Sequence, residues 1–251
     1  MLHAWQQTPD SPQALATIPM LTLADIQGDP KPLPCTQTEL GSRPMLLHSL
    51  GGDLCYMNLL FDASDLPAED MSLLHLTTRL LGSLATAQHT AGALQNAIRR
   101  SIGSLSCQAE AYHCTAQRHR LVVSLRGVCL PQCRDQAAGL IAEILTATQF
   151  TDTDAVAKML RQMKTANTQR LLSMGNRFAA SRVFARQTSA GMAKELLTGC
   201  ESIRWVAREA QGDTQEMQAL LARMEALCRR VFCRSRLTLS LSPVSYTHLT
   251  L

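Results

Sequence analysis

Three side chains that could bind a metal ion, His113, Cys114 and His119, lie close together in the sequence. Zinc in proteins is bound by imidazole nitrogen and thiolate sulfur, and structural sites usually combine four such ligands at characteristic short spacings. These three residues match no four-ligand pattern, and Gln117-Arg118-His119 has the composition of a connection between two strands. We therefore predict a polar turn here and no metal site.

The nine cysteines could act as nucleophiles, metal ligands or disulfide partners. Their number is odd, no Cys-x-x-Cys pair occurs, and the first residues lack the pattern of a secretory leader. Cys129 and Cys133 are spaced to share one helical turn, and Cys228 and Cys233 lie near a predicted helix end. These features indicate a cytoplasmic protein, because thiols stay reduced in the cytosol. We predict that the cysteines are free and are buried as small apolar side chains. The sequence also contains no nucleophile elbow and no Gly-rich phosphate loop.

Two apolar runs, Met45–Leu50 and Leu54–Phe61, precede the first long helix of the chain. Between them lies Gly51-Gly52-Asp53, whose glycines accept positive φ and whose aspartate favours a tight turn. We predict that the two runs form a β-hairpin.

The helix that follows is predicted to begin near Asp65, which can cap free N–H groups, with Pro67 in its first turn. Leucines at helical spacing then form one apolar stripe over Leu73, Leu76, Leu80 and Leu84.

The rest of the chain alternates helical and strand patterns, with apolar helix faces and capping residues in the second half. In order, we predict a helix over Thr90–Ser101 capped by Gly103, strands over Leu105–Cys114 and Arg120–Val128, a helix over Pro131–Thr148, a helix capped by Asp152 or Thr153, two or three short helices over Arg177–Ala210, a helix that begins with a capping box at Asp213–Glu216, and a strand over Arg236–Ser242. This order predicts an α+β fold in which an antiparallel or mixed sheet has helices packed on one face.

Composition excludes several classes of function. The chain has 251 residues, 46% hydrophobic and 18% charged, which is typical of a globular protein. No apolar run approaches the ~20 residues that span a bilayer, so we predict no membrane partner. The net charge of +4 is small and its basic residues are scattered, so we predict no nucleic-acid partner.

The segment Leu59–Asp70, LLFDASDLPAED, carries a family resemblance. It resembles the presequence-protease-like branch of the pitrilysin/insulinase-type zinc metallopeptidases, in which a strand ending in Phe-Asp leads through Ser-Asp-Leu-Pro into a helix. Further similar text lies, in matching order, at Ile18–Ile26, Leu81–Thr86, Gly103–Ser106, Thr148–Asp152 and Leu237–Ser240.

The resemblance implies an enzyme of two halves, each of two related domains, that close around a peptide. The active half binds zinc through His-x-x-Glu-His, in which the glutamate activates water. The matching helix here reads His75-Leu-Thr-Thr-Arg79, so Thr78 replaces the glutamate and Arg79 the second histidine. We therefore assign no catalytic, cofactor-binding or metal-binding residue, and expect zinc to be bound outside this chain.

By the same resemblance, residues 1–34 are an extended linker and residues 35–242 form a non-catalytic third domain. From its own residues, we expect Ile18–Ile26 to dock as a short strand. Residues 243–251, with Tyr246 and His248, have no counterpart, and we interpret them as an artefactual or disordered tail. The predicted function is to form part of the chamber wall of a zinc-dependent metalloendopeptidase. Its partners would be the missing N-terminal half, the fourth domain and a peptide substrate. The alternative is a stand-alone inactive homologue that binds peptides or acts as a scaffold.

Overall fold

The computed structural model describes residues 9–25, 34–48 and 52–242. These residues belong to two compact units, Met1–Leu33 and Pro34–Leu251, and each unit is described by itself. The domain boundaries predicted after residues 34 and 242 stay predictions. The described residues leave out Ile26, residues 49–50 of the predicted strand Met45–Leu50, Gly51 of the predicted turn, and the tail 243–251.

The first unit contains two short helical segments, α2 (Pro12–Leu15) and η1 (Leu23–Asp25). The strand predicted over Ile18–Ile26 is wrong for its described part, residues 18–25. The reason is local, because the Asp25 carboxylate accepts hydrogen bonds from the backbone N–H and the hydroxyl of Thr22, at 2.7 and 2.8 Å, and so bends the chain into a turn.

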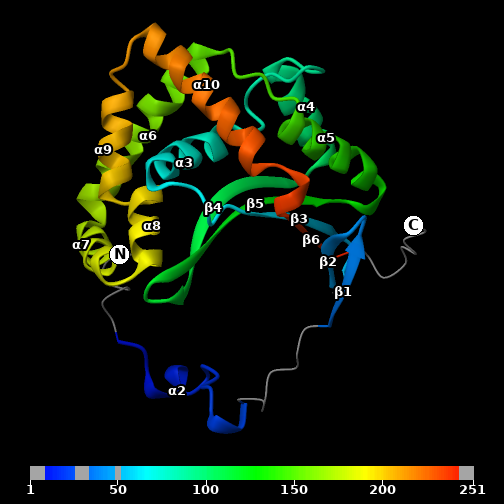
Figure 1. Cartoon of the computed structure of the whole chain (residues 1–251). Coiled ribbons are helices and arrows are strands. Elements are labelled where there is room, and N and C mark those ends of the chain that lie inside the picture. The colour runs from blue at the N-terminus through cyan, green and yellow to red at the C-terminus, as the bar shows by residue number, and fades with distance from the viewer. Residues whose placement is uncertain (1–8, 26–33, 49–51, 243–251) are drawn as a thin grey trace, which may run out of the picture. The chain divides into compact units, whose positions relative to one another are not determined.

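The second unit is a six-stranded mixed sheet with helices packed on it (Figure 1). The strands lie in the order β1-β2-β6-β3-β5-β4. The elements are β1 (Cys35–Leu40), β2 (Arg43–His48), β3 (Cys55–Asp62), η2 (Ala68–Asp70), α3 (Met71–Leu80), α4 (Ala91–Ser101), β4 (Ser104–Thr115), β5 (Arg118–Cys129), η3 (Pro131–Cys133), α5 (Arg134–Thr146), α6 (Thr153–Ser173), α7 (Gly175–Gln187), α8 (Ser189–Thr198), α9 (Cys200–Glu209), α10 (Thr214–Val231), η4 (Arg234–Arg236) and β6 (Leu237–Ser242).

The predicted hairpin of the first two apolar runs is wrong. β2 pairs antiparallel with β1 and parallel with β6, while β3 pairs antiparallel with β6 and β5. The last strand therefore lies between β2 and β3, where Leu239 is the register partner of both Met45 and Leu59. No local pattern in the sequence indicates this arrangement, because β6 is far from both neighbours along the chain.

Side-chain burial alternates along the strands and confirms the predicted packing of helices on one face. In β5, Leu121, Val123 and Leu125 are buried under the helices, whereas Arg120 and Arg126 are exposed on the opposite face. One core cluster lies beneath α3, α6, α8 and α10, and a second beneath α4 and α5. No helix in the described ranges is long and apolar enough to cross a membrane.

The helix after β3 forms as predicted, but its ends differ. Leu73, Leu76 and Leu80 are each no more than 1% exposed, which confirms the apolar stripe. The helix ends at Leu80 and not beyond Leu84, because Gly82 adopts a φ of +81° that turns the chain away.

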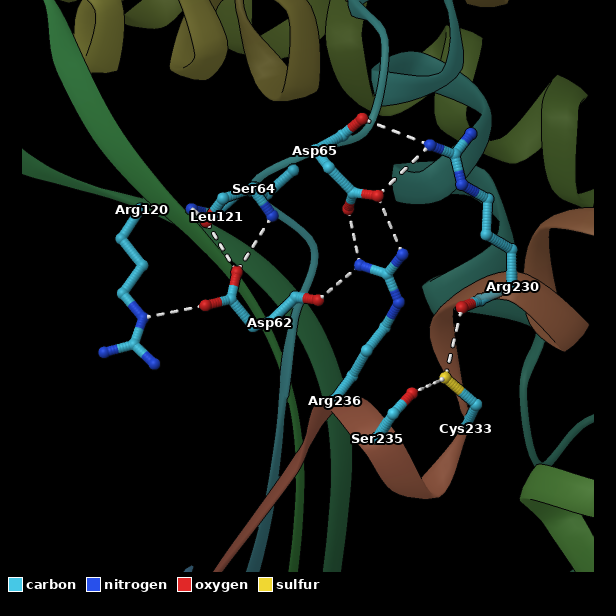
Figure 2. Close-up of polar contacts among 9 residues, drawn as sticks. All are labelled: Asp62, Ser64, Asp65, Arg120, Leu121, Arg230, Cys233, Ser235 and Arg236. Carbon is cyan, nitrogen blue, oxygen red and sulfur yellow. Dashed lines mark hydrogen bonds and ion pairs between the residues drawn. The ribbon is translucent and has the colours of Figure 1, made fainter.

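Asp65 does not cap this helix. Its carboxylate accepts hydrogen bonds from Arg236 at 2.5 and 2.8 Å, and Arg230 donates to its backbone carbonyl at 3.1 Å (Figure 2). Arg236 thereby holds the pKa of Asp65 well below its usual value. Arg236 also donates to the carbonyl of Asp62 at 2.9 Å, so this cluster joins the end of β3 to the chain entering β6.

The predicted starts of α6 and α10 are confirmed, whereas α7 begins at Gly175 and not at the predicted Arg177. Asp152 accepts a hydrogen bond from the N–H of Ala155 at 2.9 Å, and Asp213 and Glu216 form both bonds of a capping box. Gly103 does not act as a left-handed cap. Its N–H donates to the carbonyl of Val128 at 2.8 Å and begins the pairing of β4 with β5.

Candidate functional site

A groove of about 550 Å³ lies between α3, β4 and α8. Its helical walls are formed by His75, Thr78, Arg79, Lys194, Leu197 and Thr198, and its third wall by residues 106–113 of β4. Of these residues, the sequence drew attention to His75, Thr78, Arg79 and His113, but not to Lys194 or the rest of the β4 wall.

Helical spacing explains which side chains reach the groove. His75 and Arg79 are one helical turn apart and share a face of α3, while the leucine stripe holds the helix to the core. α8 is fixed beside α3 by the hydroxyl of Ser72, which donates to the carbonyl of Leu196 at 2.7 Å. The N–H of Ser189 also donates to the carbonyl of Ala116, at 2.8 Å, which ties the start of α8 to the turn between β4 and β5.

The β4 wall follows the alternation of a strand. Ala111 is the register partner of buried Leu121, so Ala111, Ala109 and Cys107 face the helices. Glu110 points to the opposite face, where it accepts a hydrogen bond from the hydroxyl of Tyr112 at 2.6 Å. The helix side of the groove therefore has small side chains along the strand.

His75 is poorly suited to bind a metal ion. Arg79 and Arg170 lie near the ring and would repel a metal cation, and burial together with these two charges lowers the pKa of His75 to about 4. Thr78 uses its hydroxyl to donate to the carbonyl of His75 at 2.9 Å, and Arg79 places a cation where a zinc site would need a ligand. In the part of the chain that the structure describes, no three His, Cys, Asp or Glu side chains cluster so that they could hold a metal ion. These residues do not fit zinc.

The predicted polar turn lies at the tip of the β4–β5 hairpin. His113 and His119 are register partners on adjacent strands, joined by the two-residue turn Ala116–Gln117. The connection is thus shorter than the predicted Gln117–His119. Cys114 is exposed beside the pair.

All nine cysteines are free thiols. The prediction of burial is correct for Cys55, Cys129 and Cys228 and wrong for Cys35 and Cys114, which are exposed. The first exposed cysteine begins the edge strand β1, and the second lies near the tip of the β4–β5 hairpin.

One thiol contact could not be read from the sequence. Cys55 is the register partner of Cys129 across β3 and β5, and burial, with this neighbour, raises the pKa of Cys129 to about 11. Cys133, expected to share a helical turn with Cys129, lies instead in η3, one short loop later.

The thiol of Cys233 lies within 3.1 Å of the Ser235 hydroxyl, and this contact lowers its pKa (Figure 2). Cys228 is a helical residue of α10, buried in the core. The predicted proximity of these two cysteines to a helix end is therefore confirmed, because α10 ends at Val231.

Residues 1–208 match the family model described as peptidase M16 subfamily C associated. The chain is 25% identical over 199 residues to Protein HypA of Clostridium perfringens, covering 78% of this chain and 20% of that protein. It is 25% identical over 232 residues to Presequence protease 1, chloroplastic/mitochondrial, of Arabidopsis thaliana, covering 92% and 22%. It is 22% identical over 235 residues to the mitochondrial presequence protease of Yarrowia lipolytica, covering 90% and 23%.

The chain thus spans about a fifth of the length of these relatives. The crystal structure of a conserved protein from Enterococcus faecalis is similar in fold, with a TM-score of 0.56 at 10% identity, covering 79% of this chain and 46% of that one. The resemblance to presequence proteases seen in the sequence is confirmed. The chain belongs to the family of domains associated with these peptidases.

Proposed function

We propose that this chain is a non-catalytic domain of a zinc-dependent metalloendopeptidase and contributes part of the wall of the chamber in which peptides are cleaved. The observation that carries the proposal is the match to two presequence proteases, which covers 92% and 90% of this chain but only 22% and 23% of theirs. A segment of that size in a larger peptidase has the length of one domain.

The chain's own residues support a binding role and not a catalytic one. A peptidase of this class needs a metal-bound water, a general base and groups that stabilise the oxyanion. In the groove, Thr78 cannot act as a base and Arg79 cannot ligate zinc. Zinc would supply the activated water when bound by another part of the enzyme, and this domain would help to enclose the peptide.

The partners that this role requires are an N-terminal half carrying His-x-x-Glu-His and a fourth domain. The chain alone, incubated with zinc, should contain no stoichiometric metal by elemental analysis and should not cleave an unstructured peptide. Mixed with both separately expressed partners, it should restore cleavage that a chelator abolishes.

Two controls make this experiment decisive. His75→Ala should leave the restored rate within a few-fold, since His75 is assigned no ligand role. The two partners without this chain should cleave far more slowly. Metal binding by the chain alone, or full activity in its absence, would refute the proposal. Assembly without chelator-sensitive cleavage would favour a stand-alone binding subunit.

A further inference from the structure

We propose that the groove between α3, β4 and α8 binds an extended peptide as an added strand on the free edge of β4, with acidic side chains at alternate positions paired to Arg79 and Lys194. The proposal rests on the proposed function only for the class of ligand, a peptide. It makes no use of zinc or of any other domain.

The strand β4 lies at one edge of the sheet. This strand has 12 residues and pairs with β5 along one side, while its other side has no strand partner among the described residues. Figure 1 labels β4 in this hairpin, with α8 and α3 nearby. Proteins usually protect such edges with lysine, proline or bulges. The sequence SLSCQAEAYHCT contains neither lysine nor proline, and its irregularity lies only at His113–Thr115.

The groove has room for the side chains of an added strand. The side chains that β4 turns toward the helices include Cys107, Ala109 and Ala111, all small. A strand laid along the edge would place every second side chain into the groove, about 7 Å apart. The groove of about 550 Å³ can take several such side chains.

The helix side of the groove is positively charged. Arg79 and Lys194 are exposed in the groove and form no ion pair with any described residue. Among the described residues that line the groove, the only carboxylate is that of Glu110, which points to the other face of the sheet and is bonded to Tyr112. His75 is neutral at pH 7. The helix side of the groove therefore carries two unpaired positive charges, which glutamate or aspartate would complement.

Backbone hydrogen bonds to β4 would give affinity, and the two cations would give a preference for sequence. The preferred peptide has acidic residues at positions i and i+2, since those side chains share one face of a strand.

The first test is fluorescence anisotropy of the purified chain with a labelled, proline-free ten-residue peptide that has glutamate at three alternate positions. A peptide with glutamine at those positions is the matched probe. We expect the glutamate peptide to bind about tenfold more tightly, and Arg79→Gln and Lys194→Gln each to weaken it about three- to tenfold, an effect that added salt should diminish. Equal binding of the two peptides would overturn the charge assignment.

Matched control variants are available. Arg186→Gln and Lys158→Gln remove exposed helical cations that lie outside the groove and form no ion pair among the described residues, and neither should change the affinity more than twofold. Losses as large as those of the groove variants would mean that the peptide responds to net charge alone.

The second test addresses the added strand. In one glutamate peptide the even-numbered amides are N-methylated, and in another the odd-numbered amides. Only one set can face β4, so one peptide should lose binding and the other should keep it. Equal effects would overturn strand addition. Because this experiment uses the chain alone, it can fail while the cleavage experiment with the partner domains succeeds.

Discussion

Replacing Gly191 by alanine should destabilise the protein, although alanine is the better helix former. A Cβ at this position would lie 2.5 Å from the carbonyl carbon of Phe184 and 2.9 Å from the nitrogen of Ala185. Ordinary contacts begin near 3.4 Å, and these atoms are backbone of α7 that no rotamer change can move. Overpacking typically costs 1–3 kcal/mol, here at the upper end, against a propensity gain of at most about 1 kcal/mol. We expect a net loss of about 2 kcal/mol.

Gly139→Ala is the matched control, because nothing lies within 4 Å of the Cβ it would add in α5. This variant should gain about 0.5–1 kcal/mol from helix propensity alone. Urea unfolding followed by circular dichroism measures both, and the melting temperature of Gly191→Ala should fall by about 4–8 °C. If Gly191→Ala were as stable as the parent while Gly139→Ala behaved as expected, the close approach of α7 and α8 would be wrong.

Three further predictions concern thiols, pH and a helix cap. Titration of the unfolded, unreduced chain should count nine thiols, and in the native protein Cys35 and Cys114 should react first; a large shortfall on unfolding would reveal disulfides. The pKa of His75 is lowered to about 4 in the folded state and is near 6.5 when unfolded, so the unfolded chain binds more protons between these values. Stability should therefore fall by up to about 3 kcal/mol as the pH drops from 6.5 to 4. In His75→Gln, the urea midpoint of unfolding should depend less on pH across this window than in the parent. The same pH dependence in both proteins would contradict the burial of this ring. Asp213→Ala should cost about 1–2 kcal/mol in urea unfolding, and Asp213→Ser should recover at least half, because serine also caps; equal losses would argue against capping.

The helices of the second half could be predicted because their signals are local. The capping side chains of α6 and α10, Asp152 and Asp213, bond to N–H groups three residues away, and the apolar stripe of α10 repeats with the helical period. The β4–β5 hairpin was predictable for the same reason, as its strands are adjacent in sequence.

The order of the strands and the groove could not be predicted, because both depend on residues far apart in sequence. β1 has no buried residue, so its polar sequence carries no alternation to detect. Asp65 has the residue type and position of a helix cap. Only the fold brings Arg236, 171 residues away, close enough to donate hydrogen bonds to its carboxylate. Arg79 and Lys194 likewise belong to different helices and line one groove only because α8 packs beside α3.

The central position of β6 constrains how this unit is made in the cell. The hydroxyl oxygen of Ser240 in β6 lies 3.1 Å from the Nε2 atom of His48 in β2, and these residues are 192 positions apart. A ribosome adds roughly 5–20 residues per second, so about 10–40 seconds pass between the synthesis of β2 and that of its neighbour β6. During that time β2 and β3 both present unpaired edges, which are prone to aggregation. Contacts this distant also slow folding, because the loop between them must close first. We therefore expect chaperone dependence during synthesis to be greatest before Leu237–Ser242 has left the ribosome.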